Sequence, residues 1–162
     1  MSVDADELRA RVEALPDPEL PMITLGELGV IRSAGTGADG RAEVEFTPTF
    51  LGCPAIPAIT AAIEEVLRDC GHPDGRVRHV LTPQWTTDRI SASGREKLAA
   101  NGIAPPGGPT PVGLGLGTPC PHCGSQDTRP HSAFGPTRCQ SMLRCAQCRE
   151  VFPCITTMRG QG

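Results

Sequence analysis

Two pairs of cysteines near the end of the chain limit most strongly what this sequence can fold into. The pairs are Cys120 with Cys123 and Cys145 with Cys148, each in the pattern Cys-x-x-Cys. Each pair presents two thiolates at a turn, and four thiolates complete the tetrahedral shell that Zn²⁺ prefers. A tail this short has too little apolar core to fold alone. Bound metal is therefore expected to supply most of its stability. The sequence therefore predicts a zinc ribbon with four cysteine ligands over residues 120–162.

Two further cysteines in the tail, Cys139 and Cys154, exceed the four that zinc requires. They are candidates for additional ligands, a buried pair or a redox pair. Because iron–sulfur clusters are also held by cysteine thiolates, a cluster is the alternative to zinc in this tail. His122 and His131 are expected to be bystanders, since four thiolates are already available.

The segment 104–119 contains five prolines and five glycines in sixteen positions, a composition that neither a helix nor a central strand tolerates. It predicts a linker between a first domain, residues 1–103, and the ribbon. The two sides also differ in charge. Residues 1–119 carry 16 acidic and 10 basic side chains, a net charge of −6, whereas residues 120–162 carry 2 and 5, a net charge of +3.

Periodicity in the first domain predicts an α+β fold. Apolar residues recur at helical spacing in three segments and alternate in three shorter ones, which gives the order αββαβα. Helices packed on one face of a small open sheet would bury this pattern. The expected helices cover residues 3–15, 55–70 and 91–102, and the expected strands cover residues 29–33, 41–47 and 76–81.

Cys53 lies in the stretch FTPTFLGCPAIPAI, between the second strand and the main helix. If Pro54 occupies the first helical position, Cys53 is the N-cap or its close neighbour; if the helix begins at Pro57, Cys53 lies in a preceding loop. Unpaired amides at a helix start lower a thiol pKa, so Cys53 is a candidate nucleophile or soft metal ligand. The alternative is a small buried cysteine, which is how we interpret Cys70.

Two acidic residues, Asp17 and Glu19, alternate with prolines in the segment PDPELP. Proline restricts the backbone, so the carboxylates are held in a nearly fixed arrangement that can orient a metal or a partner. An Asp-Pro pair also simply initiates turns, and the segment alone does not distinguish the two roles.

Charge and hydropathy exclude several classes of function. The first residues do not combine a basic start with an apolar stretch, and no apolar run approaches the ~20 residues of a membrane span. We therefore expect a cytoplasmic protein without membrane partners, in which eight cysteines indicate metal or thiol chemistry rather than disulfides. A net charge of −3 gives no general footprint for nucleic acid.

Several motifs together resemble the PaaD family of bacterial phenylacetate degradation. They are DPELP, FTPTFLGCPA, TPQWTTDRI, GIAPP, CPHC, FGPTRCQSMLRC and CREVFPCI, which span nearly the whole chain. The first domain resembles the small domain of SufT and other iron–sulfur assembly factors. In that domain the acidic segment and a cysteine before proline are the marked features, which implies a role for Asp17, Glu19 and Cys53 in handling iron or a cluster.

The resemblance implies an accessory factor without catalytic turnover. Its role would be to mature or assemble the multicomponent phenylacetyl-CoA oxygenase, whose parts include a di-iron oxygenase and a reductase with flavin and an iron–sulfur centre. The implied cofactors are structural Zn²⁺ and, in transit, iron or an iron–sulfur cluster. The implied partners are the oxygenase and reductase subunits and the general iron–sulfur assembly machinery, with a homodimer as a further option.

Three other functions stay open from the sequence. The protein could be a structural zinc-binding subunit of the complex. It could be a nucleic-acid-binding ribbon, although its arginines are not interleaved with aromatic residues. It could also be an enzyme with Cys53 as nucleophile and His72 or His79 as base. Trp85 and Thr87 are expected either to line the same face as Cys53 or, for Trp85, to pack the core.

Overall fold

The computed structural model describes residues 4–50, 52–105 and 118–155. Its contacts divide the chain into two compact units, Met1–Trp85 and Thr86–Gly162. Most of the predicted linker, residues 106–117, lies outside the described residues, as does the end of the predicted ribbon from residue 156.

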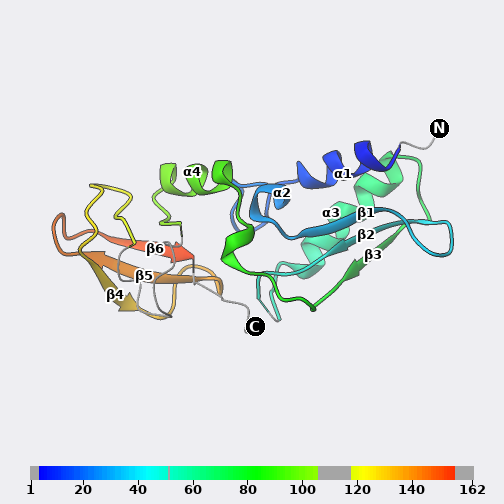
Figure 1. Cartoon of the computed structure of the whole chain (residues 1–162). Helices are drawn as coiled ribbons and strands as arrows, with labels where there is room; N and C mark the ends of the chain where they lie inside the picture. Colours follow the sequence, from blue (N-terminus) through cyan, green and yellow to red (C-terminus); the bar gives the residue numbers. More distant parts are fainter. Residues whose placement is uncertain (1–3, 51, 106–117, 156–162) are drawn as a thin grey trace. The chain divides into compact units, whose positions relative to one another are not determined.

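The first unit contains a three-stranded sheet in the order β1-β2-β3. Strands β1 (Ile31–Thr36) and β2 (Ala42–Phe46) form the predicted antiparallel hairpin. Strand β3 (Arg76–His79) pairs with β2 in parallel, which is possible because helix α3 (Ile56–Asp69) carries the chain back between them. Figure 1 shows α3 beside this sheet. The predicted α+β class is confirmed.

The two faces of this sheet differ in polarity. On β2, Val44 and Phe46 are fully buried, whereas Glu43 and Glu45 are partly exposed and both form ion pairs with Arg78 of β3. Alternate residues of a strand point to opposite faces, so one face is apolar and the other carries charge.

The apolar core of the first unit is made by this face together with helices α1 (Ala5–Glu13) and α3. Asp4 caps α1 by accepting the N–H of Glu7 at 2.8 Å. Two residues of α1 and three of α3 recur at three- and four-residue spacing and are buried. They are Leu8, Val12, Ile59, Ile63 and Leu67.

A short helix that periodicity did not predict, α2 (Leu25–Leu28), follows the acidic segment. Thr24 and Glu27 form a capping box, in which the side chain of each accepts the backbone N–H of the other at 3.1 and 3.0 Å. Gly29 ends the helix with a φ of 75°. One turn is too short to show a hydrophobic period, although the Thr-x-x-Glu signature marks its start.

The second unit begins with the 3₁₀ turn η1 (Thr87–Arg89) and helix α4 (Ala92–Ala100). Ser91 caps α4 by accepting the N–H of Gly94 at 3.0 Å, as expected for the predicted capped helix. The sequence assigned this helix to the first domain, whereas the contacts group it with the ribbon. The predicted division of the chain into an assembly domain (1–103), a linker (104–119) and a zinc ribbon (120–162) stays a prediction.

Three antiparallel strands form the ribbon, in the order β4-β5-β6. They are β4 (Thr128–Ser132), β5 (Gln140–Cys145) and β6 (Val151–Ile155). Ala104, at the start of the predicted linker, instead pairs with Cys154 of β6 in an isolated parallel bridge and is fully buried. Among the described helices of both units, none is long and apolar enough to cross a membrane.

We expect Gly26→Ala to destabilise the first unit by about 1–3 kcal/mol, the range for overpacked sites. A Cβ at this position would lie 2.7 Å from the Cβ of Glu13 and 3.0 Å from its carbonyl oxygen, so α1 and α2 would have to separate. Gly35→Ala is the matched control, since a Cβ there meets no atom within 4 Å. Urea unfolding followed by the fluorescence of Trp85, the only tryptophan, measures both variants. Equal stability of the two would show that α1 and α2 are not closely packed.

Candidate metal centre

The four predicted cysteine ligands come together in the ribbon. Cys120, Cys123, Cys145 and Cys148 place their sulfur atoms within 4.8 Å of one another. Two short distances join the two turns: 3.7 Å between the sulfurs of Cys120 and Cys148, and 3.6 Å between those of Cys123 and Cys145. No other group of three or more candidate ligands occurs in residues 4–50, 52–105 and 118–155.

These distances fit a tetrahedral metal. With Zn–S bonds of ~2.3 Å, the edge of a regular tetrahedron of sulfurs is ~3.8 Å. The two sulfur–sulfur distances that join the turns are close to this edge length. A centre of four thiolates and no oxygen ligand suits zinc or an iron–sulfur centre and disfavours magnesium or calcium. When bound, such an ion supplies the positive charge that holds four thiolates together.

The two ligand pairs lie on turns of the same shape. The carbonyl of Cys120 accepts the N–H of Gly124 at 2.8 Å, and that of Cys145 accepts the N–H of Arg149 at 3.0 Å. The residue that closes each turn has positive φ: 77° at Gly124 and 68° at Arg149. Glycine adopts this conformation without cost, whereas arginine does not.

Backbone amides and neighbouring sulfurs move the thiol pKa values apart. The N–H of Cys148, followed by that of Gln147, lowers the pKa of Cys145 to about 6 against the opposing effect of burial. At Cys148 the N–H of Glu150 lowers the thiol pKa, but burial and the neighbouring thiols outweigh this effect and raise the pKa to about 12. The pKa of Cys123 is also raised, although the N–H of Ser125 acts to lower it. The site therefore opposes the accumulation of thiolates unless a cation is bound.

The ligands are also part of the apolar core of the ribbon. Six buried residues form this core, and two of them are the ligands Cys120 and Cys145. Cys148 packs against it. The other core residues are Ala104, Leu143, Phe152 and Cys154.

The two surplus cysteines lie outside the group of four. Cys154 is buried, its thiol lies 3.5 Å from the carbonyl oxygen of Ile155, and burial raises its pKa to about 11. Cys139 is half-buried, with its sulfur 3.0 Å from the hydroxyl of Thr137. Neither belongs to the ligand group found among the described residues.

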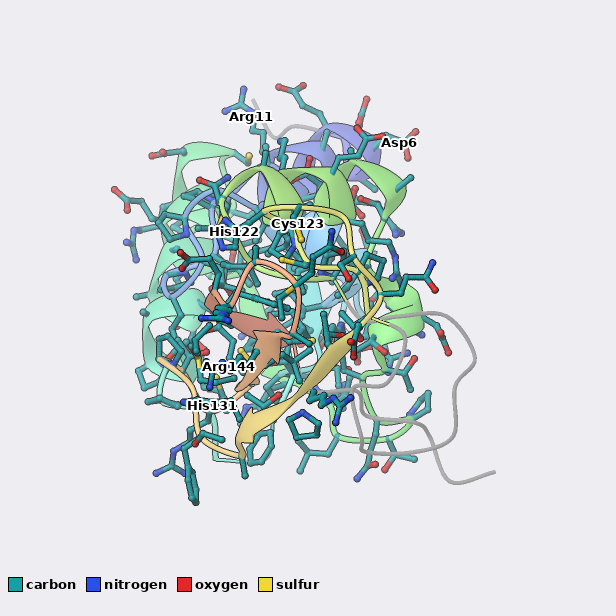
Figure 2. The ribbon with its side chains drawn as sticks, turned by 90° about the vertical axis from the view of Figure 1, so that its left-hand side faces the viewer. Asp6, Arg11, His122, Cys123, His131 and Arg144 are labelled. Atoms are coloured by element: carbon teal, nitrogen blue, oxygen red, sulfur yellow. The ribbon has the colours of Figure 1, made fainter. Side chains whose placement is uncertain are left out.

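Two histidines also lie in the ribbon. His122 stands next to the ligand Cys123 (Figure 2) and packs edge-on against Phe152, with 6.2 Å between ring centroids. His131 is an exposed residue of β4. Neither belongs to the ligand group of the described residues, and that both are bystanders to the metal stays a prediction.

Cys53 lies in a turn before α3, two residues ahead of the N-cap. The cap is Ala55, and Pro57 occupies the first helical turn, so the expectation that Pro54 begins the helix is wrong and the alternative start near Pro57 is confirmed. The Cys53 carbonyl accepts the N–H of Ile56 at 3.2 Å, and the Cys53 thiol is half-buried. Two prolines compete for the helix start, and local sequence does not decide between them.

Asp17 organises the acidic segment from within. Its Oδ1 accepts the N–H groups of Glu19 at 2.9 Å and Leu20 at 2.8 Å, and its own N–H donates to Ile23 at 2.9 Å. Burial raises the pKa of the Asp17 carboxyl, and the two backbone hydrogen bonds oppose the rise without cancelling it. The turn-forming role of Asp17 is therefore present, and Glu19 lies half-buried beside it.

Sequence comparisons agree with both halves of this architecture. Residues 5–81 match the family "Iron-sulfur cluster assembly protein", and residues 105–155 match the "PaaD zinc beta ribbon domain". An Escherichia coli protein proposed to be a subunit of 1,2-phenylacetyl-CoA epoxidase is 38% identical over 90% of this chain and 88% of its own length. The chain belongs to the PaaD family.

Two further relatives match a little more than half of this PaaD-family chain. The Fe-S protein maturation auxiliary factor YitW of Bacillus subtilis is 30% identical over 53% of the chain and 84% of its own length. A crystal structure from Bacillus anthracis, described as a domain of unknown function DUF59, superposes with a TM-score of 0.51 at 28% identity. It covers 58% of the chain and 90% of its own length.

Four other residues that the sequence marked as candidates lie in the core, in a turn or beside a buried ring. Trp85 is 3% exposed and donates its indole N–H to the carbonyl of Leu28 at 2.8 Å, so its core role is present. His72 lies in the turn after α3, where its carbonyl accepts the N–H of Gly75 at 3.0 Å. The ring of His79 lies 6.3 Å from that of Phe46 in a tilted arrangement. Thr87, also buried, belongs to the second unit.

The structure also contains a basic cleft of about 480 Å³ that the sequence did not predict. Residues of β4, β5 and the second ligand turn line it. They are Arg129, Pro130, His131, Arg144, Cys145, Ala146 and Arg149. The sequence signal was weak, because these residues come together only through the register of β4 with β5.

Chelation of the metal is expected to unfold the ribbon and leave the first unit folded, because two of the ligands are core residues of the ribbon. NMR amide dispersion of the full chain checks the ribbon, and the fluorescence of Trp85 checks the first unit. Cys120→Ser should reproduce the effect, whereas Cys139→Ser should retain the metal. A ribbon that keeps its dispersion after metal removal would refute the dependence on metal.

Asp17→Ala is expected to lower the free energy of unfolding of the first unit by about 1–3 kcal/mol, because two backbone amides lose their acceptor. Asp17→Asn keeps an acceptor oxygen and should retain stability. Because the folded pKa of Asp17 is raised, the part of the stability that depends on protonation of Asp17 is complete below the unfolded pKa and is lost as pH rises through the folded pKa. Asp17→Asn should remove this dependence. Urea unfolding at acidic and neutral pH tests both, and an asparagine variant as unstable as the alanine variant would contradict the capping role.

Proposed function

We propose that this chain is a non-catalytic accessory factor that delivers iron or an iron–sulfur cluster to the phenylacetyl-CoA oxygenase system in the cytosol. The observation that carries the proposal is the match of residues 5–81 to the iron–sulfur cluster assembly family. The E. coli relative, proposed to be a subunit of the epoxidase, supports the choice of client.

Cys53 is the residue proposed to bind the cargo. The first unit contains two cysteines, and Cys70 is fully buried whereas Cys53 is half-buried in a loop before a helix. A thiolate binds iron strongly yet exchanges with other thiolates, so a single accessible cysteine can accept an ion or cluster and release it to ligands of the client. Cys53 is therefore the cysteine of this unit that an iron ion or cluster could reach.

Asp17 and Glu19 are proposed to support that step from the acidic segment. Asp17 fixes the turn through its two backbone hydrogen bonds and thereby sets the position of Glu19. Glu19 then offers a carboxylate oxygen, a ligand type that iron also accepts. In this scheme Asp17 is a positioning residue, and Glu19 is the one that contacts the cargo.

The ribbon is proposed to hold structural zinc and to recognise the client. Its four thiolates fill a tetrahedral shell, which leaves no open position for exchange. Delivery therefore falls to the first unit, and the partners are the oxygenase and reductase subunits, with the general assembly machinery as the source of cargo. Cys139 and Cys154, outside the ligand group, have no assigned part in this scheme.

Cys53→Ser is expected to leave the fold and the zinc content unchanged and to lower the metal loading of the client. The oxygenase and reductase are expressed with the wild-type or variant chain, purified anaerobically and analysed for iron, zinc and the absorbance of the iron–sulfur centre. A several-fold loss of client iron with the complex still assembled is the expected result. Cys139→Ser is the matched control, since Cys139 is also half-buried but lies outside the ligand group.

Client proteins that contain their full complement of iron when expressed with the Cys53→Ser variant would refute the delivery proposal. They would favour a structural zinc-binding subunit, in which the ribbon holds the complex together. Turnover of a small substrate that stops on alkylation of Cys53 would instead favour an enzyme. Elemental analysis of the isolated chain, with and without Cys53, tests whether iron is bound before the client is reached.

A further inference from the structure

The basic cleft of the ribbon is lined by three arginines and a histidine. Figure 2 shows Arg144 and His131 on the same side of the ribbon, and both line the cleft. Arg129 forms an ion pair with Asp127 at 3.5 Å, in which both side chains are largely exposed. Arg144 and Arg149 form no ion pair with any residue that the structure describes. Positive charge is therefore concentrated here, and among the described lining residues it is opposed by the Cys145 sulfur of the metal centre.

Two of these arginines are placed against each other by the sheet. Arg129 of β4 lies directly opposite Arg144 of β5 in the antiparallel register. Like charges in directly opposed positions destabilise a sheet, because their side chains leave the same face a few ångströms apart. An anionic group bound between them would reverse this repulsion.

Arg149 has an unfavourable backbone conformation, in addition to the repulsion between Arg129 and Arg144. It closes the second ligand turn with a φ of 68°, at the position where the first turn has Gly124. A non-glycine residue in this region is disfavoured, and such departures concentrate at functional sites. A glycine would close the turn equally well, so the arginine side chain is present at a conformational cost.

We propose that this cleft binds an acidic segment of a partner protein, with side-chain carboxylates paired to Arg129, Arg144 and Arg149. Guanidinium groups bind carboxylates through two parallel hydrogen bonds, which favours arginine over lysine for this task. The cleft, at about 480 Å³, is much larger than the ~30 Å³ share of one water, so one inorganic anion would not fill it. It can accept several side chains of a peptide.

Two features favour a peptide that contacts side chains over other occupants. Pro130 and the bulge between Pro130 and Ser132 interrupt β4, so this edge cannot extend the sheet by regular main-chain pairing. Among the residues that the structure describes, the lining also lacks the phenylalanine, tyrosine or tryptophan rings on which single-stranded nucleic acid stacks. The inference goes beyond the proposed function and stands without it, since neither Cys53 nor iron takes part.

The test measures binding of a fluorescein-labelled hexaglutamate peptide to the full-length, zinc-loaded chain by fluorescence anisotropy. Arg129→Glu and Arg144→Glu are expected to raise the Kd at least about tenfold, because attraction becomes repulsion at the contact. Arg138→Glu is the matched control: it makes the same change of charge at an exposed arginine outside the cleft, and it should raise the Kd less than about twofold.

A second measurement separates binding from a structural role. Arg129→Glu places opposite charges across the ladder, so its thermal unfolding midpoint should stay equal or rise while peptide binding is lost. If the arginines only neutralise the thiolate centre, both cleft variants will release zinc more readily to a chromogenic chelator and peptide binding will not change. That result would overturn the proposal.

Other outcomes also decide against the proposal. Absence of hexaglutamate binding to the wild-type chain overturns it, as do an equal loss of binding in Arg138→Glu and equal binding of a hexaglutamine peptide. Tighter binding of a single-stranded oligonucleotide than of hexaglutamate, with the same dependence on Arg144, assigns the cleft to nucleic acid. Displacement of the peptide by an equimolar amount of inorganic phosphate assigns it to a small anion.

Discussion

The convergence of four sulfur atoms is the constraint on which the second half of the molecule depends. Distances of 3.6 and 3.7 Å between thiols are too short for a set of thiolates without a cation, and the separated pKa values of Cys145 and Cys148 express this conflict. A bound metal removes it and at the same time fixes two turns. Because Cys120 and Cys145 also belong to the apolar core, a metal bound by them would hold core residues in place directly.

The first unit depends on a different kind of constraint, the satisfaction of backbone groups in its loops. Asp17 accepts two amides of the acidic segment, and Thr24 and Glu27 cap the short helix that follows. The carbonyl at the end of that helix, on Leu28, accepts the indole N–H of Trp85. The first two sets of contacts are local, whereas the third joins the end of the short helix to a residue 57 positions later in the chain. The acidic segment and the helix after it are therefore held by hydrogen bonds of side chains to the backbone.

Sequence patterns predicted the elements whose signal is repetitive. Helix α3 shows a long 3.6-residue period, the β1–β2 hairpin shows alternation around a glycine-rich turn, and the four ligands show fixed spacing. Patterns failed where competing local signals or long-range pairing decide the outcome. Pro54 and Pro57 both suit a helix start, and Ala104 leaves the predicted linker because β6 offers it hydrogen-bond partners.

The same reason explains why the basic cleft was not evident. Arg129 and Arg144 are far apart in the sequence and meet only through the register of the ladder. The ribbon can accommodate this unfavourable pair together with the positive φ of Arg149. Such costs are about 1–2 kcal/mol per residue for the backbone and up to about 1 kcal/mol for the pair. Structural zinc contributes about 10–16 kcal/mol to folding in small zinc-binding peptides, which exceeds both. A metal-supported fold can therefore present a surface that a small apolar core could not stabilise, and this links the four thiols to the arginines around them.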